Sequence, residues 1–232
     1  MEFLFASDEW QVLMDNLPNL PFATWESFYA TAISTLLAMV VGLPLGVLLV
    51  AGEKDGVLPL PGWLMTLLNA VINLLRSVPF LILMIAVLPL SMFVLGTSIG
   101  TPASIIPLFI ASFPFVSRLV ETSLREVDGG VIEAAQSMGA TPMQIITKVM
   151  IPESLPSLIA NATIAMTTIL GYSAMAGIIG GGGLGQIAIN YGYYRYKYLI
   201  MVVATVLLVV MVQIFQSIGT WLAVRCDKRL RK

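Results

Sequence analysis

The sequence contains no histidine and a single cysteine, Cys226, among its 232 residues. These absences exclude a Ser-His-Asp triad, a metal site with histidine ligands and an intrachain disulfide. Charged residues make up only 11% of the chain, whereas a soluble domain carries about 25%. Because the net charge is −1, no global field attracts nucleic acid and no nucleic-acid partner is expected.

Apolar residues are abundant instead. Hydrophobic side chains account for 58% of the chain, and the mean hydropathy is +0.91. A helix needs about 20 apolar residues to cross the hydrocarbon core of a bilayer. The sequence therefore predicts an all-α integral membrane protein with about five transmembrane helices, at about 28–51, 78–95, 103–120, 155–179 and 199–224.

The segment 63–75 is also apolar, but its polar residues share one helical face. Thr66, Asn69, Asn73 and Arg76 recur at intervals of three and four residues, which is the helical period. We interpret this segment as an amphipathic lead-in to the second span and not as a span of its own.

The basic residues set the predicted orientation. The tail 225–232 is rich in Lys and Arg, so the positive-inside rule places it in the cytoplasm. Five spans then put the N-terminus outside, where residues 1–27 hold five acidic and no basic residues. This gives an N-out, C-in chain with an extracytoplasmic segment 1–27, a transmembrane domain 28–224 and a cytoplasmic tail. We expect the outer segment to form a short amphipathic helix.

Two short helices are predicted in the longest hydrophilic stretch, about 121–153, on the cytoplasmic side. The signals are an N-cap, a left-handed glycine after the first helix and a capping box for the second. These roles fall, in that order, to Asp128, Gly139 and the pair Thr141 and Gln144. The second helix is expected to stop before Pro152, which cannot continue it.

The first of these helices is unusually apolar for a solvated loop. Glu133 is its single acid, and its other contact residues are Val131, Ile132, Ala134, Ala135 and Met138. A short helix with small, apolar contact residues suits a groove on another protein. The alternative that the residues leave open is packing back onto the chain's own spans.

This part of the sequence resembles the EAA motif of ABC importer permeases. It reads EAAQSMG, then nine further residues, then VMIP. The motif positions are occupied by Glu133, Ala134, Ala135, Gly139, Val149, Ile151 and Pro152, with Val149 and Ile151 as mild departures. The resemblance implies that this helix is a coupling helix, which docks in a cleft of an ATP-hydrolysing subunit. Its expected coupling residues are Glu133, Ala134, Ala135, Met138 and Gly139.

Over roughly 69–193, the chain resembles the permease subunits of bacterial methionine importers. The segments that carry the resemblance are RSVPFLILMI, TSIGTPASIIPL, EAAQSMGATPMQI and GYSAMAGIIGGGGLGQIA. The resemblance implies a type I ABC importer permease fold in the bacterial inner membrane, with alternating access for L- or D-methionine. A permease for another amino acid or small solute is the alternative. The implied partners are a second copy, two ATP-binding subunits, an extracytoplasmic substrate-binding protein or lipoprotein, and lipid. The chain itself is expected to be no enzyme and to bind no cofactor, with ATP and Mg on the partner.

The glycine-rich segment has two open interpretations. Gly180, Gly182 and Gly185 satisfy G-x-G-x-x-G, but an apolar helix precedes them and no Lys-Ser/Thr follows, so nucleotide binding is not expected. One interpretation is close helix packing through Gly177, Gly181 and Gly185. The other is a broken helix at membrane depth that lines a pathway.

The candidates for a gate or pathway precede these glycines. Tyr172 and Ser173 offer hydroxyl groups, and Met175 offers a flexible thioether that repacks easily. Asn69 and Asn73 are further pathway candidates, for which hydrogen bonds between helices are the alternative.

The charged residues near the predicted spans are interpreted as structural. We expect Arg76 to anchor the chain at the membrane surface, with a substrate ligand as the alternative. Glu121 is spaced to pair with Arg125, and the helical face that they share with Arg118 is expected to be solvated, with contact to a partner as the alternative. No acid lies in a span core, so an intramembrane hydrolase is not expected.

Overall fold

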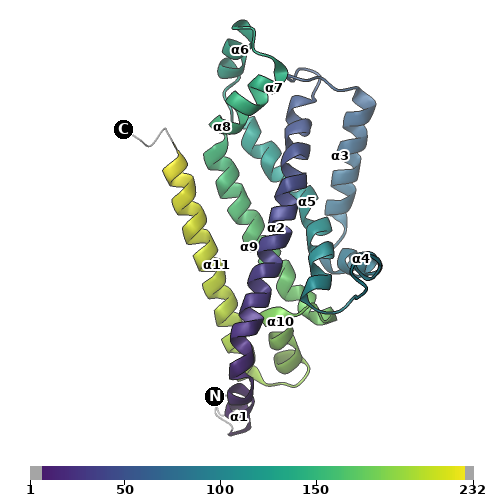
Figure 1. The fold of residues 1–232 in the computed structure, drawn as a ribbon, viewed down its shortest axis with the longest axis vertical. Helices are drawn as coiled ribbons and strands as arrows, with labels where there is room; N and C mark the ends of the chain where they lie inside the picture. Colours follow the sequence, from purple (N-terminus) through teal and green to yellow (C-terminus); the bar gives the residue numbers. More distant parts are fainter. Residues whose placement is uncertain (1–6, 228–232) are drawn as a thin grey trace. The chain divides into compact units, whose positions relative to one another are not determined.

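The computed structural model describes residues 7–227, and all regular structure in this range is helical (Figure 1). The tail residues 228–232 lie outside the described range. The helices, with 3₁₀- and π-helices labelled η, are α1 (Ser7–Asn16), η2 (Leu17–Asn19), α2 (Leu20–Ala51), α3 (Gly62–Ser77), α4 (Phe80–Leu95), α5 (Thr101–Arg125), α6 (Gly129–Ser137), α7 (Pro142–Ile145), η3 (Ile146–Met150), α8 (Ile151–Glu153), α9 (Leu155–Ala176), η4 (Gly177–Ile179), α10 (Gly183–Ile187), η5 (Ala188–Tyr193) and α11 (Tyr198–Cys226).

Four helical stretches of the described chain are long and apolar enough to cross a membrane. They are Asp8–Ala51, Thr101–Arg125, Leu155–Ile179 and Tyr198–Cys226. A fifth span results if α3 and α4 are taken together as one broken span. The predicted all-α architecture with about five spans is therefore confirmed.

The predicted second span, 78–95, is wrong in extent. α4 contains only 16 residues, fewer than the about 20 that a spanning helix needs, and it reaches the length of a span only together with α3, from which it is bent by 107°. The helix breaks because Pro79 disfavours a helical conformation in the residue before it. Val78 accordingly has an extended ψ of 128°.

The chain divides into two compact units. Unit 1 comprises the described parts of Met1–Thr35 together with Pro79–Ile110 and Met166–Phe215. Unit 2 comprises Leu36–Val78, Ala111–Ala165 and the described part of Gln216–Lys232.

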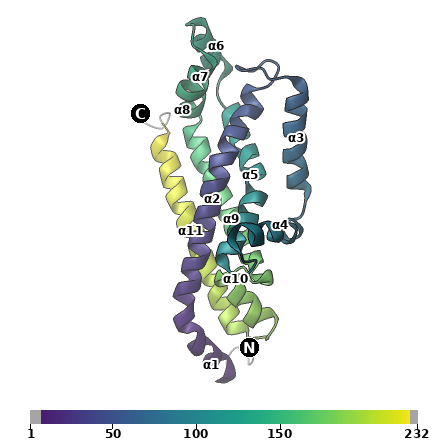
Figure 2. The ribbon, with the colours of Figure 1, turned by 45° about the vertical axis from the view of Figure 1, so that its right-hand side comes forward.

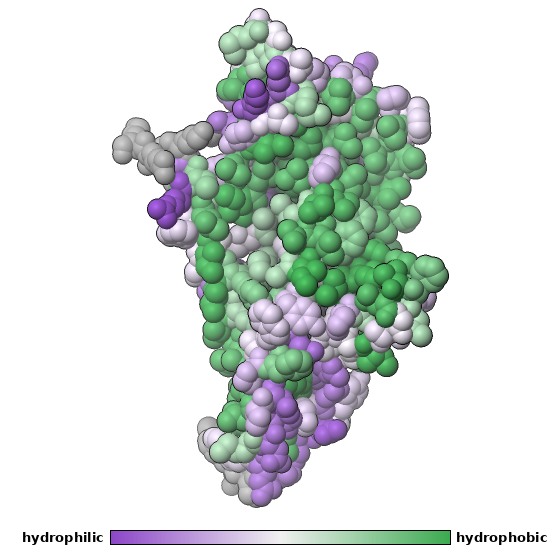
Figure 3. All heavy atoms as spheres, in the orientation of Figure 1, coloured by the Kyte–Doolittle hydropathy of each residue, from purple (hydrophilic) through white to green (hydrophobic). Residues whose placement is uncertain are grey.

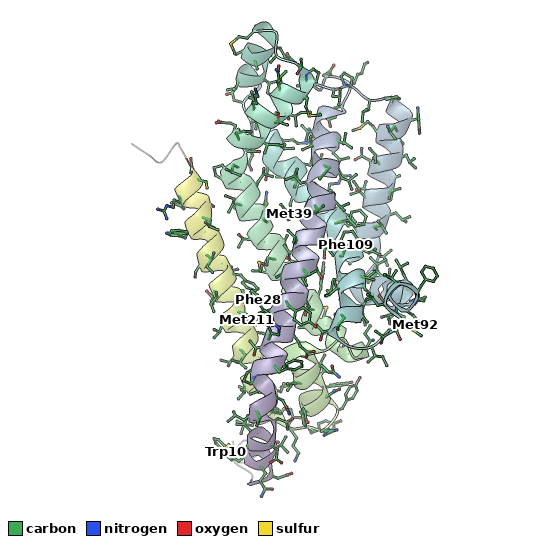
Figure 4. The ribbon with its side chains drawn as sticks, in the orientation of Figure 1. Trp10, Phe28, Met39, Met92, Phe109 and Met211 are labelled. Carbon is green, nitrogen blue, oxygen red and sulfur yellow. The ribbon has the colours of Figure 1, made fainter. Side chains whose placement is uncertain are left out.

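Unit 1 has an apolar core built from its segments of α2, α9, α10 and α11. Phe28 lies beside Met211 in Figure 4, and its ring centroid lies 5.9 Å from that of Phe215. The buried cluster consists of Leu20, Ala23, Leu170, Leu184, Ala204, Met211 and Phe215. In a membrane, close van der Waals packing of such side chains holds helices together, because lipid tails are as apolar as the core.

The N-terminal helix predicted within residues 1–27 is confirmed as α1 over its described part. α1 is tied to the start of α11, because Asp8 forms an ion pair with Lys197. Glu9 is only 5% exposed and accepts a hydrogen bond from the Leu199 N–H at 3.0 Å. A carboxylate at this position satisfies a donor that the first turn of α11 leaves unpaired.

In unit 2, small residues bring α2 and α5 into close contact. A Cβ atom added to Gly46 would lie 2.6 Å from the Cβ of Val120, and one added to Gly42 would lie 2.7 Å from Val116 Cγ1. Any larger side chain at either glycine would therefore force the two helices apart.

α3 has two asparagines bonded to the protein, Asn69 and Asn73, and large apolar side chains toward the surroundings. Ile72 is 2% exposed, whereas Trp63 and Leu74 on the opposite side are 69% and 68% exposed. The exposed surface of α3 accordingly has hydrophobic colouring in Figure 3. Such a distribution suits contact with lipid, where polar groups must face the protein interior. The predicted amphipathic helix is therefore confirmed.

Candidate functional site

The first helix of the predicted cytoplasmic loop is capped as expected. Asp128 is the N-cap of α6, and its Oδ1 accepts a hydrogen bond from the Gly130 N–H at 2.7 Å. Gly139, just past the end of α6, has a φ of +77°. A residue with a Cβ atom is strained there, so glycine permits the tight turn toward α7. α6 and α7 lie next to one another in Figures 1 and 2, and we call them the hairpin.

The capping box of the second helix is also confirmed, but its predicted end is wrong. The Gln144 side chain accepts from the Thr141 N–H at 2.9 Å, and Thr141 Oγ1 accepts from the Gln144 N–H at 3.4 Å. Helical structure does not stop before Pro152, because α7 continues through the π-helix η3 into α8. In the π-turn, the Ile151 N–H bonds to Ile146 O, five residues back. This wider turn accommodates a proline that lacks an N–H.

Four of the five predicted coupling residues are exposed on the hairpin. Glu133, Ala134 and Gly139 are exposed, and Met138 is 81% exposed. Ala135 differs, because it is 4% exposed and buried by its own chain. One side of α6 therefore packs against its own chain, at α7 and η3, and the other side is exposed. Their coupling role stays a prediction.

A network of charged and amide side chains lies within unit 2, close in the chain to the hairpin. Arg118 Nη2 donates to Asn69 Oδ1 at 2.8 Å and to Asn73 Oδ1 at 2.9 Å, which joins α5 to α3. Its Nη1 pairs with Glu121 Oε2 at 2.6 Å. The expected interhelical bonds of the two asparagines are therefore confirmed, while their pathway role stays a prediction.

Arg125 extends this network to Glu53, two residues past the end of α2. Its Nη2 pairs with Glu121 Oε1 at 2.8 Å, as predicted from the spacing, and with Glu53 Oε1 at 2.5 Å. The prediction of a solvated face is wrong for Arg118 and Glu121, whose side chains are 21% and 13% exposed. Arg118 is bonded to α3 and to Glu121, and of the three residues only Arg125, 46% exposed, matches that prediction.

In unit 1, the glycine-rich segment both breaks the helix and allows close packing. Helical structure stops after η4, and Gly180, Gly182 and Gly183 have φ values of +80°, +78° and +71°. The two arms of the break approach closely, because a Cβ atom on Gly177 would lie 2.4 Å from the Gln186 nitrogen. One on Gly185 would lie 2.3 Å from Ala174 O. The broken helix is confirmed, and a pathway along it stays a prediction.

Glu26 holds this break and was missed as a site residue. One carboxylate oxygen accepts from the Thr101 hydroxyl at 2.8 Å, and the other accepts from the Gly183 N–H at 3.0 Å. The neighbouring Ser27 hydroxyl accepts from the Leu184 N–H at 2.9 Å. The signal that the sequence offers is an isolated acid just before a long apolar stretch.

The gate candidates next to the break differ in their surroundings. The Tyr172 ring stacks on Phe80 with centroids 4.3 Å apart. Ser173 is 7% exposed and Met175 is 49% exposed. These three belong to unit 1, whereas Asn69 and Asn73 belong to unit 2. No group of three or more His, Cys, Asp or Glu that could hold a metal occurs within residues 7–227.

The fold and the hairpin define the class of protein. Several helices are long and apolar enough to cross a membrane, and a capped helical hairpin with exposed Val131 and Met138 lies between two of them in the chain. The chain belongs to the family described as "Binding-protein-dependent transport system inner membrane component", which matches residues 42–232. It is therefore a multi-pass protein of the inner membrane.

Curated relatives and a solved structure match nearly the whole chain. A probable D-methionine transport system permease protein MetI of Vibrio cholerae is 51% identical over 95% of this chain and 97% of its own length. A probable D-methionine transport system permease protein MetI of Haemophilus influenzae is 46% identical over 89% of this chain and 97% of its own length. A solved structure of inward-facing conformations of the MetNI methionine ABC transporter has a TM-score of 0.88 at 41% identity, covering 93% of this chain and 98% of its own.

Proposed function

We propose that this chain is the transmembrane permease subunit of an ATP-driven importer for methionine. The observation that carries the proposal is the 51% identity to a methionine permease over 97% of that protein's length. The 0.88 TM-score to a methionine ABC transporter supports it. A permease for another amino acid remains the alternative, because no residue described above selects methionine by its chemistry.

In this proposal the chain binds no nucleotide, and ATP and Mg are bound by a separate subunit. Two such subunits, a second copy of this chain and an extracytoplasmic binding protein complete the importer. The family description, which names dependence on a binding protein, supports the last of these partners. A groove on the ATP-binding subunit receives the exposed side of α6.

The contacts of unit 2 suggest how a displacement of the hairpin reaches the spans. Asp128, which caps α6, follows Arg125 by three residues. Arg125 is paired with Glu53, in the loop just after α2, and with Glu121. Glu121 is paired with Arg118, which is bonded to α3. A rigid movement of α6 therefore pulls on α5, α2 and α3 together, and this movement alternates access to a cavity between two copies.

The test is ATP-dependent uptake of labelled methionine into vesicles that contain this chain and its ATP-binding subunit. We expect uptake by the wild type and its loss in Ala134→Arg, because a long cation on the exposed side of α6 prevents docking in an apolar groove. Binding of the ATP-binding subunit, measured by co-purification, should fall in parallel.

Asp55→Arg is the matched control, because it places the same cation on an exposed residue of the 52–58 loop outside the hairpin. Its uptake should equal that of the wild type. Uptake of a different amino acid by the wild type would remove methionine from the proposal. Normal uptake and normal co-purification of Ala134→Arg would remove the docking role of α6.

A further inference from the structure

Glu26 connects three segments of unit 1 that lie far apart in the sequence. It belongs to α2, and its partners Thr101 and Gly183 are 75 and 157 residues away along the chain. Each of its two oxygens has one of these partners, at 2.8 Å and 3.0 Å. The carboxylate thus joins α2, the first residue of α5 and the break in the fourth span, and we call this arrangement the Glu26 clamp.

The backbone around the clamp is shaped to admit it. A Cβ atom added to Gly182 would lie 1.9 Å from the Thr101 hydroxyl oxygen, and one added to Gly183 would lie 2.5 Å from the Ser27 hydroxyl oxygen. The break therefore rests directly on α2 and α5 through bare backbone. A further backbone bond, from the Gly100 N–H to Gly180 O at 2.8 Å, joins the same segments.

The chemistry of the clamp makes it a strong local constraint. A carboxylate that accepts from a backbone N–H forms a charge-assisted hydrogen bond, which is stronger than a bond between neutral groups. Three glycines with positive φ make the break conformationally permissive. A permissive backbone adopts one conformation only if contacts of this kind select it.

We propose that Glu26 is a positioning residue for transport, which fixes the broken end of the fourth span to α2 and α5 so that the three move as one body. This inference rests on the proposed function. When the spans rock, the clamp carries the break with them and keeps substrate movement tied to ATP hydrolysis. Without the clamp the break moves independently, and hydrolysis proceeds without import.

Two substitutions at Glu26 distinguish the effect of losing the hydrogen bonds of the clamp from the effect of losing the negative charge. Glu26→Gln keeps both bonds, because the amide oxygen accepts from Gly183 N–H and the amide nitrogen donates to the Thr101 hydroxyl. Glu26→Leu removes both. We expect Glu26→Leu to lower methionine uptake per ATP hydrolysed about tenfold, given the strength of hydrogen bonds to charged groups, and Glu26→Gln to restore it. Thr101→Val, which loses one bond, should lower this ratio about threefold.

A second readout reports on the position of the break itself. Ile178, in η4, is 43% exposed, so Ile178→Cys in a Cys226→Ser background provides a single thiol there. A membrane-impermeant thiol reagent should label this site several-fold faster with Glu26→Leu than with Glu26. Asp15→Leu is the matched control, because Asp15 is an exposed acid of unit 1 outside the clamp. It should change neither readout.

The outcomes separate the clamp from the proposed function. If the wild type imports no methionine but labelling at Ile178→Cys accelerates, the clamp stands and the proposed function fails. Unchanged coupling and labelling in a normally inserted Glu26→Leu overturn the positioning role, as does equal loss in Glu26→Gln. If Glu26→Leu does not reach the membrane, Thr101→Val decides, and an unchanged ratio and labelling rate in that variant overturn the proposal.

Discussion

Each unit of the molecule contains a network of polar contacts that we call a knot, and the two knots are centred on groups of opposite charge. In unit 1 the Glu26 carboxylate accepts hydrogen bonds from a hydroxyl and from the backbone of Gly183. In unit 2 the Arg118 guanidinium donates to one carboxylate and two side-chain amides. The first knot therefore depends on where glycines place the backbone, and the second depends on side chains alone.

This difference predicts different responses to substitution. Side chains can rotate and repack around a lost partner, whereas a backbone N–H held at a fixed position has no other way to reach its acceptor. Damage to the backbone of unit 1 should therefore affect stability more than damage to the side-chain network of unit 2. Within unit 2, the half-buried core of the network should matter more than its exposed rim.

The largest effect is expected from Gly182→Ala in unit 1. The added methyl group would lie 1.9 Å from Thr101 Oγ1, and the residue would keep a φ of +78°. Overpacking and backbone strain together should lower the free energy of unfolding by about 3 kcal/mol. Chemical unfolding of the purified protein in mixed micelles measures this change.

Two glycines serve as controls for this substitution. Gly96 has a φ of +72° but open space around it, so Gly96→Ala isolates the conformational strain, at about 1 kcal/mol. Gly62 has open space and no positive φ, so Gly62→Ala should stay within about 0.5 kcal/mol of the wild type. Equal stability of all three variants would show that unit 1 tolerates movement at its backbone knot.

The same distinction explains what the sequence could predict. The helix caps at Asp128 and the capping box of Thr141 involve residues two or three apart, so local pattern was sufficient to find them. The apolar spans were found because length and hydropathy are also local properties. The partners of Glu26 lie 75 and 157 residues away, and no local pattern indicates such a contact.

The features that local pattern failed to indicate have physical causes of the same kind. Pro152 was expected to end a helix, but a π-turn accommodates it, and π-turns leave no clear local signal. The face of Arg118 and Glu121 was expected to be solvated, but Arg118 donates to two asparagines of α3 that lie 49 and 45 residues away, and no local pattern indicates these bonds. The residues predicted to couple the chain to an ATP-hydrolysing subunit were chosen through a motif, and their coupling role stays a prediction.

An intermediate effect is expected from Arg118→Leu in unit 2. This change removes the partner of Asn69 and Asn73 and one of the two partners of Glu121, whose side chain is 13% exposed. We expect the free energy of unfolding to fall by about 2 kcal/mol, since Arg125 still pairs with Glu121.

Two further substitutions, Arg118→Lys and Asn69→Ala, test which bonds of Arg118 account for this loss of stability. Lysine keeps the charge near Glu121 but lacks the planar fork that reaches two amides, so it should lower stability by about 1 kcal/mol. A double-mutant cycle between Arg118→Leu and Asn69→Ala should show positive coupling, because the two side chains share a bond of 2.8 Å. Strict additivity of the two changes would contradict the link between α3 and α5.

The smallest effect is expected from Glu53→Ala at the rim of the network. Glu53 and Arg125 are each 46% exposed, and water and salt screen an ion pair of this kind. Such pairs contribute about 0.5 kcal/mol or less, and Arg125 keeps Glu121 as a partner. The unfolding free energy should therefore hardly change, and high salt should remove the difference that remains. A loss of more than about 1 kcal/mol that persists in high salt would show that the end of α2 belongs to the core of the unit 2 knot.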